Sequence, residues 1–344
     1  MGVQFNVFKG SKTGEITESK GYRDPKSTEV IVKISHCGVC GSDEHFRHAE
    51  QGLGHEGIGI ITEVGSSVHD LSKFRIGDRV GMSWFHKFCG YCKQCITGHQ
   101  NKCVNSTYFG SADQDQGCFG TAVAWDVSAL FKIPDEIASE DAGPLMCAGA
   151  TVWSPLYDQG LLPGDRIGVI GIGGLGHLAI QFASKMGMEV VVFSSTEAKK
   201  QEAIAFGASE FHATSGVESL GGITKVDALL ITTNVNPDLS LVPPADPSRR
   251  FLPVLAAGAK IFPLTISMEV LPFTPLALIG GFLSVIGSGL APTASVRAML
   301  NFAAKNGIKP QIEKFPMTQA GVTEAMQKLR DGKMRYRGVL VVPN

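Results

Sequence analysis

The feature that most constrains the fold is the run of residues 165–187, in which a short apolar segment enters a glycine-rich turn and leaves it as an apolar-faced helical pattern. The pattern predicts a strand, a helix and a second strand, over residues 166–170, 175–186 and 189–193. A glycine turn between strand and helix can cradle the pyrophosphate of a dinucleotide, because the helix N-terminus presents free N–H groups and the positive end of its dipole. An ordinary glycine-rich turn is the alternative.

The turn has the spacing G-x-G-x-x-G, formed by Gly171, Gly173 and Gly176. These glycines allow a tight turn, close approach of the backbone to a phosphate and close packing of the helix on the strand. We therefore predict that the cofactor-binding residues include the three glycines together with Gly174 and Leu175.

Strand and helix patterns continue to alternate after this turn, with further strands expected over residues 226–232, 259–264 and 282–287. Such alternation is typical of an α/β fold with a parallel, doubly wound sheet. Proline-rich residues 236–250 predict an irregular connection. The pattern closes with two helices and a strand, over residues 295–306, 321–331 and 336–342.

Length and composition indicate a globular protein. At 344 residues the chain is long enough for two domains, and its net charge of -1 gives no reason to expect a nucleic-acid or anionic membrane partner. No window reaches about 18 uninterrupted apolar residues, and the start lacks the pattern of a signal peptide. We expect a cytoplasmic protein.

Four of the eight cysteines fall within fifteen residues. They are Cys89, Cys92, Cys95 and Cys103. The spacing suits four thiolates around one zinc ion, a closed tetrahedral site with no position open for chemistry and therefore a structural one. An iron–sulfur cluster and unligated buried cysteines are the alternatives.

Three other residues could form a second metal site. Cys40 follows a strand pattern, His55 lies fifteen residues later, and Cys147 comes just before the nucleotide-binding stretch. Three protein ligands leave a fourth position open, as in a catalytic zinc site. From spacing alone, ordinary core or surface positions are the alternative.

Taken together, these motifs resemble those of the zinc-dependent medium-chain alcohol dehydrogenases, and most of all the NADP-dependent, cinnamyl-alcohol-dehydrogenase-type branch. The matching segments, in order, are residues 40–43, 54–56, 89–103, 145–156 and 171–176. The resemblance implies a GroES-like, mostly β catalytic domain of residues 1–148 and 289–344, with an inserted Rossmann domain of residues 149–288. It also implies a homodimer and an active site between the domains.

The resemblance assigns the metal ligands. Cys40, His55 and Cys147 would hold a catalytic zinc, and Glu56 is the nearby carboxylate that can approach the metal. The four clustered cysteines would hold a structural zinc, which makes two zinc ions per chain. The loop between Cys40 and His55 is shorter than is usual in the family, so substrate specificity does not carry over directly.

Three residues beside Cys40 have implied catalytic roles. The Ser42 hydroxyl would pass a proton, and His45 occupies the position of the relay histidine. Asp43 would orient a ligand histidine. A turn hydroxyl and a surface histidine are the alternatives for Ser42 and His45.

Aromatic residues are expected to line the substrate pocket. Trp84 and Phe85 match channel positions of the resembled family, and Trp153 lies six residues after Cys147. An aromatic-walled cleft ending at a metal favours aromatic or medium-sized aliphatic aldehydes. The alternative for each residue is simple core packing.

The cofactor preference is predicted from a missing acid. NAD-binding members of this fold place Asp or Glu at the end of the second strand, to bind the ribose 2'-hydroxyl. Here Ser194 and Ser195 stand there, with no carboxylate before Glu197. Two hydroxyls can donate to a 2'-phosphate, and Lys199 or Lys200 can supply countercharge, so we predict NADP(H).

The sequence therefore predicts a zinc-dependent oxidoreductase that transfers a hydride between NADP(H) and an aldehyde or primary alcohol. The alternatives are an NAD-dependent secondary alcohol or polyol dehydrogenase of the same superfamily, a zinc-free quinone reductase, and a noncatalytic relative kept for a binding or structural function. Metal content and cofactor preference distinguish them.

Overall fold

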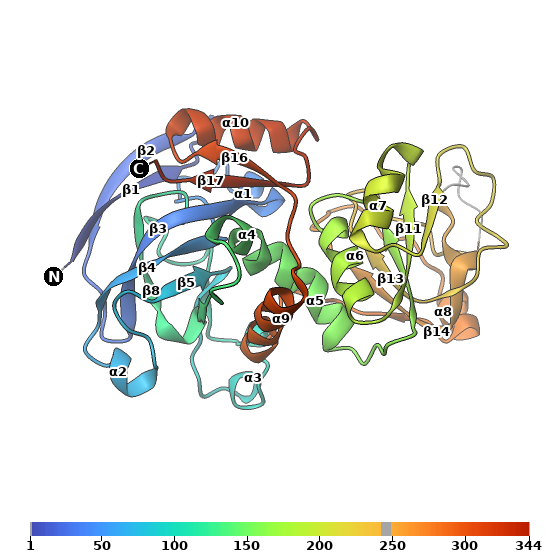
Figure 1. Cartoon of the computed structure of the whole chain (residues 1–344), viewed down its shortest axis with the longest axis horizontal. Helices are drawn as coiled ribbons and strands as arrows, with labels where there is room; N and C mark the ends of the chain where they lie inside the picture. The colour runs from blue at the N-terminus through green and yellow to red at the C-terminus, as the bar shows by residue number, and fades with distance from the viewer. Residues whose placement is uncertain (1, 242–248, 344) are drawn as a thin grey trace. The chain divides into compact units, whose positions relative to one another are not determined.

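The computed structural model describes residues 2–241 and 249–343, and the chain divides into two compact units. The first unit comprises Met1–Ala150 and Ala291–Asn344, and the second comprises Thr151–Leu290 (Figure 1). The nucleotide-binding motif thus lies in a unit whose chain is inserted into the other. The domain boundaries expected after residues 148 and 288 stay a prediction.

The first unit is built on a seven-stranded mixed sheet. Its path runs through β16 (Ile312–Pro316), β17 (Arg337–Val341), β3 (Glu29–Val39), β4 (Gly57–Val64), β5 (Arg79–Met82) and β9 (Leu130–Lys132), and β8 (Ala122–Asp126) pairs with β3. Two small antiparallel sheets join β1 (Val3–Lys9) to β2 (Thr17–Arg23) and β6 (Phe85–Lys87) to β7 (Thr107–Tyr108).

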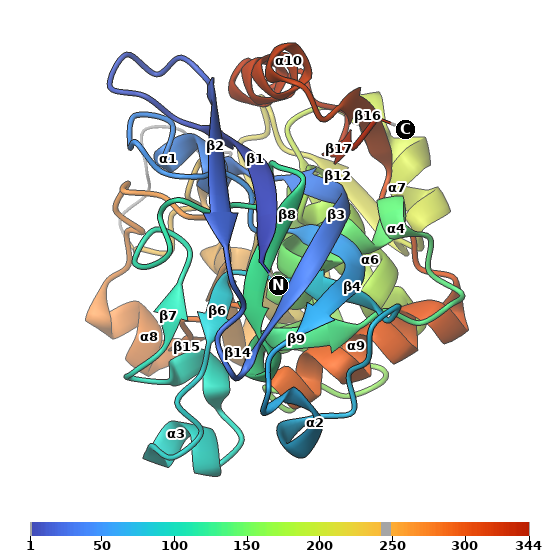
Figure 2. The same ribbon diagram turned by 90° about the vertical axis from the view of Figure 1, so that its left-hand side faces the viewer.

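Strand β3 lies at the centre of the first unit because its apolar run is buried on both faces. Val30 and Val32 contribute to the main core, whereas Ile31 packs with Phe5 and Val7 of β1 in a second cluster. Figure 2 shows β1, β8 and β3 next to one another. This alternation fixes the register of β3, and therefore the place where its C-terminal end delivers Cys40.

The helices of the first unit are short except near the C-terminus. They are α1 (Gly41–His45), α2 (Val68–Leu71), α3 (Lys93–Ile96), α4 (Ser139–Pro144), α9 (Thr293–Asn306) and α10 (Gln319–Arg330). Single turns lie at η1 (Gln100–Lys102), η2 (Val127–Ala129) and η3 (Leu145–Gly149). The turn η3 is π-helical and runs directly into α5 (Ala150–Tyr157).

The second unit is a parallel six-stranded sheet. Its order is β12 (Glu210–Ala213), β11 (Glu189–Ser194), β10 (Arg166–Ile170), β13 (Val226–Ile231), β14 (Leu255–Pro263) and β15 (Ser284–Val285). The connecting helices are α6 (Gly176–Lys185), α7 (Lys200–Phe206) and α8 (Pro275–Gly281), with the short turns η4 (Glu197–Lys199) and η6 (Leu252–Val254). This order and the GroES-like first unit confirm the predicted α/β fold class.

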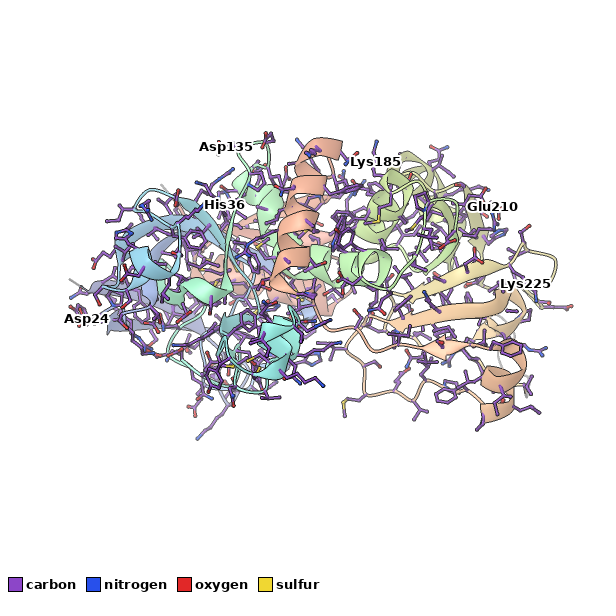
Figure 3. The ribbon with its side chains drawn as sticks, turned by 90° about the horizontal axis from the view of Figure 1, so that it is seen from below. Asp24, His36, Asp135, Lys185, Glu210 and Lys225 are labelled. Carbon is purple, nitrogen blue, oxygen red and sulfur yellow. The ribbon has the colours of Figure 1, made fainter. Side chains whose placement is uncertain are left out.

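Arg166 joins the starts of three parallel strands. Its guanidinium lies 2.7 Å from Glu189 of β11 and 2.7 Å from Glu210 of β12, which is labelled in Figure 3. These ion pairs lie at the N-terminal end of β10. The glycine turn follows the opposite, C-terminal end of the same strand.

One expected strand is shorter in the structure, and the proline-rich connection is irregular as predicted in its described part. The strand predicted over residues 282–287 is only Ser284–Val285, because Phe282 adopts a left-handed conformation (φ 54°) and ends α8. In the proline-rich connection, residues 242–248 lie outside the described residues. The described residues on either side form isolated bridges, from Asp238 to Arg250 and from Leu239 to Phe273.

Among residues 2–241 and 249–343, no helix has both the length and the apolarity needed to cross a membrane.

Candidate functional site

The first unit brings together Cys40, His55, Glu56 and Cys147. One candidate ligand atom from each of them lies within 4.8 Å of all the others, close enough to hold one metal ion. The residues come from the end of β3, the start of β4 and the π turn η3. They are separated in sequence but converge because β3 and β4 are antiparallel neighbours.

The chemistry of this cluster fits a metal ion. The two sulfur atoms of Cys40 and Cys147 are 4.0 Å apart, and the buried Nε2 of His55 has no hydrogen-bond partner. A hydrogen bond from the Cys147 thiol lowers the pKa of Cys40 well below its usual value, against the opposing effect of burial. A thiolate, a second thiol and an unpaired imidazole nitrogen are the donors that zinc prefers.

Asp43 holds the neighbouring ligands in place. Its Oδ1 accepts hydrogen bonds from the Nδ1 of His55 (2.9 Å) and the backbone N–H of Gly54 (3.1 Å), and its Oδ2 accepts from the backbone N–H of Cys40 (3.0 Å). The carboxylate is fully buried. Because the Nδ1–H of His55 donates to Asp43, the lone pair of the neutral imidazole is on Nε2, the nitrogen within the ligand cluster.

Glu56 is the fourth member, and Arg337 of β17 donates a hydrogen bond to its Oε1. The other carboxylate oxygen is buried without a partner. Burial raises the pKa of Glu56 to about 7, although Arg337 opposes the change. Gly38 makes the room, since a Cβ there would lie 1.9 Å from Oε2 of Glu56. Sequence reasoning missed Arg337, although a charged residue within the apolar closing strand was a signal.

The two predicted proton-transfer residues lie on α1. Ser42 is buried, with its hydroxyl 3.6 Å from the sulfur of Cys40. His45 is the last residue of the helix and is exposed. The structure thus brings Ser42 to the ligand cluster and leaves His45 within reach of solvent.

Of the three aromatic residues predicted to line a pocket, Trp84 contacts a candidate ligand. Its ring centroid lies 5.3 Å from that of His55, at an interplanar angle of 82°. Phe85 packs against Phe88 instead (5.0 Å). Trp153, in the second unit, is buried with 1% of its surface exposed, which favours the alternative of core packing for this residue.

Phe109 and Phe46 complete the aromatic surroundings of the ligands, and sequence reasoning missed both. The ring centroid of Phe109 lies 5.0 Å from that of His55, and the ring centroid of Phe46 lies 5.0 Å from that of Phe109. The backbone N–H of Phe109 donates to the carbonyl of Trp84 (2.8 Å), so the two aromatic segments are tied together. The side of His55 that faces them is apolar.

A second cluster has the geometry of a four-thiolate site. The sulfur atoms of Cys89, Cys92, Cys95 and Cys103 all lie within 4.8 Å of one another. Cys89 is 3.9 Å from Cys95 and 3.5 Å from Cys103, and Cys92 is 3.9 Å from Cys103. Zinc–sulfur bonds of about 2.3 Å place the corners of a tetrahedron about 3.8 Å apart. The distances are also too long for disulfides, so the cluster fits a structural metal.

The thiols of this cluster differ in acidity. Although burial opposes the change, the backbone N–H groups of Cys92 and Tyr91 lower the pKa of Cys89 to about 6. Burial raises the pKa of Cys95 to about 12. The backbone N–H groups therefore favour the thiolate form of Cys89, which is the form that binds a metal ion.

The glycine turn of the second unit is shaped for close approach. Gly171 has φ 90°, and a Cβ on Gly176 would lie 2.0 Å from the carbonyl oxygen of Gly171. A Cβ on Gly173 would meet no atom within 4 Å, so this edge of the turn is open. Gly174 and Leu175 lead from it into α6. The turn fits a pyrophosphate beside the helix N-terminus.

The residues at the end of β11 lie next to this turn, because the backbone N–H of Gly171 donates to the carbonyl of Phe193 (2.7 Å). Ser194 ends the strand and Ser195 is exposed. Lys199 reaches back to the turn, where its Nζ donates to the carbonyl of Ile172 (2.9 Å).

Lys200 behaves differently from Lys199. It pairs with Glu197 at 3.2 Å, and both side chains are more than half exposed. Glu197, the first acidic residue after β11, therefore forms an ion pair with Lys200.

Comparison with known proteins gives consistent results. Residues 26–135 match the alcohol dehydrogenase GroES-like domain family. The chain is 33% identical over 324 residues to the aldehyde reductase AdhA of Synechocystis, covering 91% of each. It is 32% identical over 337 residues to a probable cinnamyl alcohol dehydrogenase of rice, covering 94% of this chain and 88% of the relative.

Two solved structures share the fold over nearly the whole chain. A cinnamyl alcohol dehydrogenase from Sorghum bicolor superposes with a TM-score of 0.87 and 28% identity, covering 99% of this chain and 98% of the other. The corresponding enzyme of Helicobacter pylori, solved with NADP(H), gives a TM-score of 0.85 and 26% identity, with 99% coverage of both chains. Together with the two cysteine-containing clusters, these similarities show that the chain belongs to the zinc-dependent medium-chain alcohol dehydrogenases, as a member of the cinnamyl-alcohol-dehydrogenase type.

Proposed function

We propose that this alcohol dehydrogenase reduces an aldehyde, or oxidises the matching primary alcohol, with NADP(H), and that Cys40, His55 and Cys147 hold its catalytic zinc. The observation that carries the proposal is the convergence of these three side chains around a buried His55 nitrogen without a hydrogen-bond partner. A zinc ion there would polarise the carbonyl oxygen, and the reduced nicotinamide would supply the hydride.

The chain's own residues would prepare the site for this chemistry. Asp43 fixes the tautomer and the orientation of His55 through the hydrogen bond at Nδ1. The Ser42 hydroxyl lies beside Cys40, where it can donate a proton to the substrate oxygen during reduction. His45 is exposed at the end of the same helix and can restore that proton from solvent.

The aromatic neighbours of His55 support a substrate with an apolar body. Trp84 and Phe109 cover the imidazole with apolar surface, which favours aromatic or medium-sized aliphatic aldehydes. Relatives named as aldehyde reductase and cinnamyl alcohol dehydrogenase support the same substrate class.

The preference for NADP(H) is supported by Ser194, Ser195 and Lys199. Ser194 and Ser195 stand where an NAD-binding protein of this fold has an acid, and the ammonium group of Lys199 lies at the glycine turn. Hydroxyl donors and a cation can bind a 2'-phosphate that a carboxylate would repel. A relative in Mycolicibacterium smegmatis is named an NADP-dependent alcohol dehydrogenase.

A homodimer and a cytoplasmic location are also proposed. The apolar side chains of Met268, Val270, Ile279 and Phe282 in the second unit are each more than two thirds exposed. Exposed apolar side chains of this kind suit contact with a second copy of the chain. Ile279→Lys should convert a dimer to a monomer in sedimentation analysis; a wild-type monomer would exclude the dimer. Cell fractionation tests the location.

The central experiment combines metal content with turnover. We expect about two zinc ions per chain and higher kcat/KM with NADPH than with NADH on a panel of aldehydes. Cys40→Ser and His55→Ala should abolish turnover without unfolding the protein, whereas Cys37→Ala, a buried thiol outside both clusters, serves as the control. Full turnover of a folded Cys40→Ser protein would exclude the proposed site.

A further inference from the structure

Cys147 lies in a π-helical turn, η3, between α4 and α5. Single π turns are rare and occur mostly at functional sites. The amide N–H groups that follow η3 donate to the carbonyls of Leu145 and Cys147, and they pass over the carbonyl of Met146 between them. In a regular α-helix that carbonyl would accept from the N–H four residues later.

The carbonyl of Met146 is satisfied by a side chain from another element. The hydroxyl of Ser83 donates to it at 2.6 Å, and both residues are buried. A buried carbonyl without a partner costs free energy comparable to a lost hydrogen bond. The Ser83 hydroxyl therefore takes the place of the helical N–H that the π turn has displaced.

Ser83 is itself fixed relative to the other ligands. It directly follows β5, which pairs with β4, the strand that begins just after His55 and Glu56. Gly81 in β5 allows the turn to approach closely, since a Cβ there would lie 2.4 Å from the sulfur of Met146. The hydrogen bond from Ser83 thus ties the turn carrying Cys147 to the sheet carrying His55.

We propose that Ser83 is a positioning residue for the metal site, because its hydroxyl holds the π turn open and so directs the sulfur of Cys147 toward Cys40. If the turn relaxed to an α-helix, each shift of one residue would rotate a side chain by about 100° around the helix axis. The sulfur of Cys147 would then move away from the sulfur of Cys40. The two sulfur atoms are 4.0 Å apart in the structure. The proposal rests on the catalytic metal site proposed above.

The test compares Ser83→Ala with Ser83→Thr, which keeps a hydroxyl donor. Zinc affinity of each site is measured by chelator competition, and the thiolate ligation by the charge-transfer bands of the cobalt-substituted protein. Ser83→Ala should weaken the catalytic site by about 10- to 100-fold and reduce its thiolate–cobalt absorption, with the four-cysteine site unchanged. Ser83→Thr should restore both readouts.

Ser128→Ala is the matched control, because the Ser128 hydroxyl accepts from the backbone N–H of Phe88 (3.0 Å) in the same unit and is not bonded to the π turn. Wild-type affinity and spectrum in Ser83→Ala would overturn the proposal. Unfolding of Ser83→Ala with loss of both metals would also overturn it, because the hydroxyl would then serve the fold as a whole. A wild-type protein with only one tight zinc would instead refute the catalytic site itself.

Discussion

Arg337 donates a hydrogen bond to Glu56 although the two residues lie 281 positions apart in the chain. Both side chains are buried in the first unit. The closing strand β17 thus supplies the positive charge that faces Glu56. Burial raises the pKa of this carboxyl group to about 7. Folding of the metal cluster therefore depends on the C-terminal return of the chain.

We predict that Arg337→Met lowers the free energy of unfolding by about 3–5 kcal/mol, because it leaves the Glu56 carboxylate buried without its partner. The double variant Arg337→Met/Glu56→Gln should recover a large part of the loss, since no buried charge remains. Urea unfolding of the four proteins, with zinc saturating, gives the coupling free energy. Additive effects of the two substitutions would mean that the ion pair has no energetic role.

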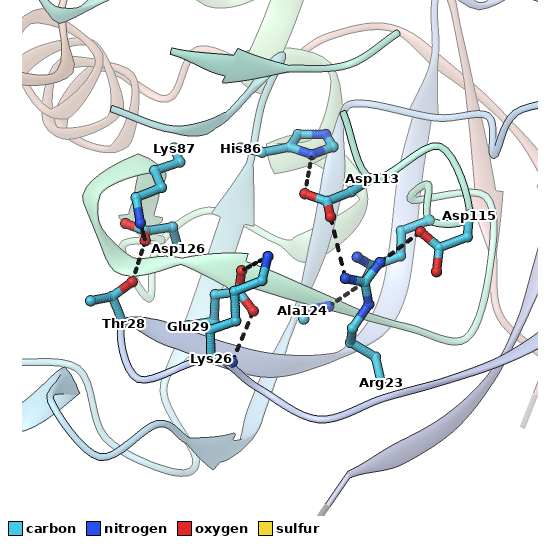
Figure 4. A network of polar contacts seen from close by, with 11 residues as sticks. Arg23, Lys26, Thr28, Glu29, His86, Lys87, Asp113, Asp115, Ala124 and Asp126 are labelled. Carbon is cyan, nitrogen blue, oxygen red and sulfur yellow. Dashed lines mark hydrogen bonds and ion pairs between the residues drawn. The ribbon is translucent and has the colours of Figure 1, made fainter. Parts of the chain in front are cut away.

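A second prediction concerns acid stability and the network in Figure 4. Asp113 accepts from Arg23 (3.3 Å) and lies 3.7 Å from His86, while Asp115 pairs with the same arginine (2.6 Å). The neighbouring His86 imidazole lowers the pKa of Asp113 to about 2, aided by the charges of Lys26 and Arg23 and opposed by burial.

A depressed carboxyl pKa stabilises the fold above its unfolded value of about 3.9, and that stabilisation is lost as the pH falls through the folded value. Asp113→Asn should therefore be less stable than wild type by about 1–2 kcal/mol at pH 5, and the difference should shrink as the pH falls and vanish only below about pH 2. Asparagine also tolerates the left-handed backbone at this position (φ 50°), so the variant tests charge. Asp115→Asn, at a more exposed site, should show a smaller difference; a pH-independent difference for Asp113→Asn would contradict the linkage.

The sequence predicted the metal ligands better than their supports. Cys89 to Cys103 form one local spacing, so that cluster could be found by reading along the chain, whereas Cys40, His55 and Cys147 are assigned as ligands through the family resemblance. The Ser83–Met146 and Glu56–Arg337 contacts join distant segments, and neither leaves a local periodicity. Both contacts are determined by tertiary packing and could not be predicted from a local sequence pattern.

The aromatic predictions show the same limit. Adjacent residues in extended chain point in opposite directions, so Trp84 reaches His55 while Phe85 packs on Phe88. The sequence could not say which of the two faces the ligands, because the register of this short segment depends on its pairing with β7. Phe109 arrives beside His55 through that same pairing and carries no motif of its own.

For the substrate site, we predict that Trp84→Ala lowers kcat/KM for an aromatic aldehyde about tenfold more than for acetaldehyde, because the larger substrate loses more apolar contact. Trp84→Phe should give an intermediate ranking. Trp153→Phe is the control: its indole is buried, so the change should affect stability and leave the ranking alone. An unchanged ranking in Trp84→Ala would assign this indole to core packing.

The last prediction separates the two cofactors at the end of β11. Ser194→Asp should lower kcat/KM for NADPH by at least about 100-fold, since two like charges about 4 Å apart repel by about 4 kcal/mol near a protein surface. Lys199→Ala should lower kcat/KM for NADPH by about tenfold, because it would remove the charge-assisted hydrogen bond that we propose for the 2'-phosphate. Both variants should change kcat/KM for NADH by less than about threefold, because NADH lacks this phosphate. Lys200→Ala is the matched control, since that lysine pairs with Glu197. Equal losses with both cofactors in Ser194→Asp would place this residue away from the 2'-position, and a wild-type preference for NADH would refute the assignment of NADP(H).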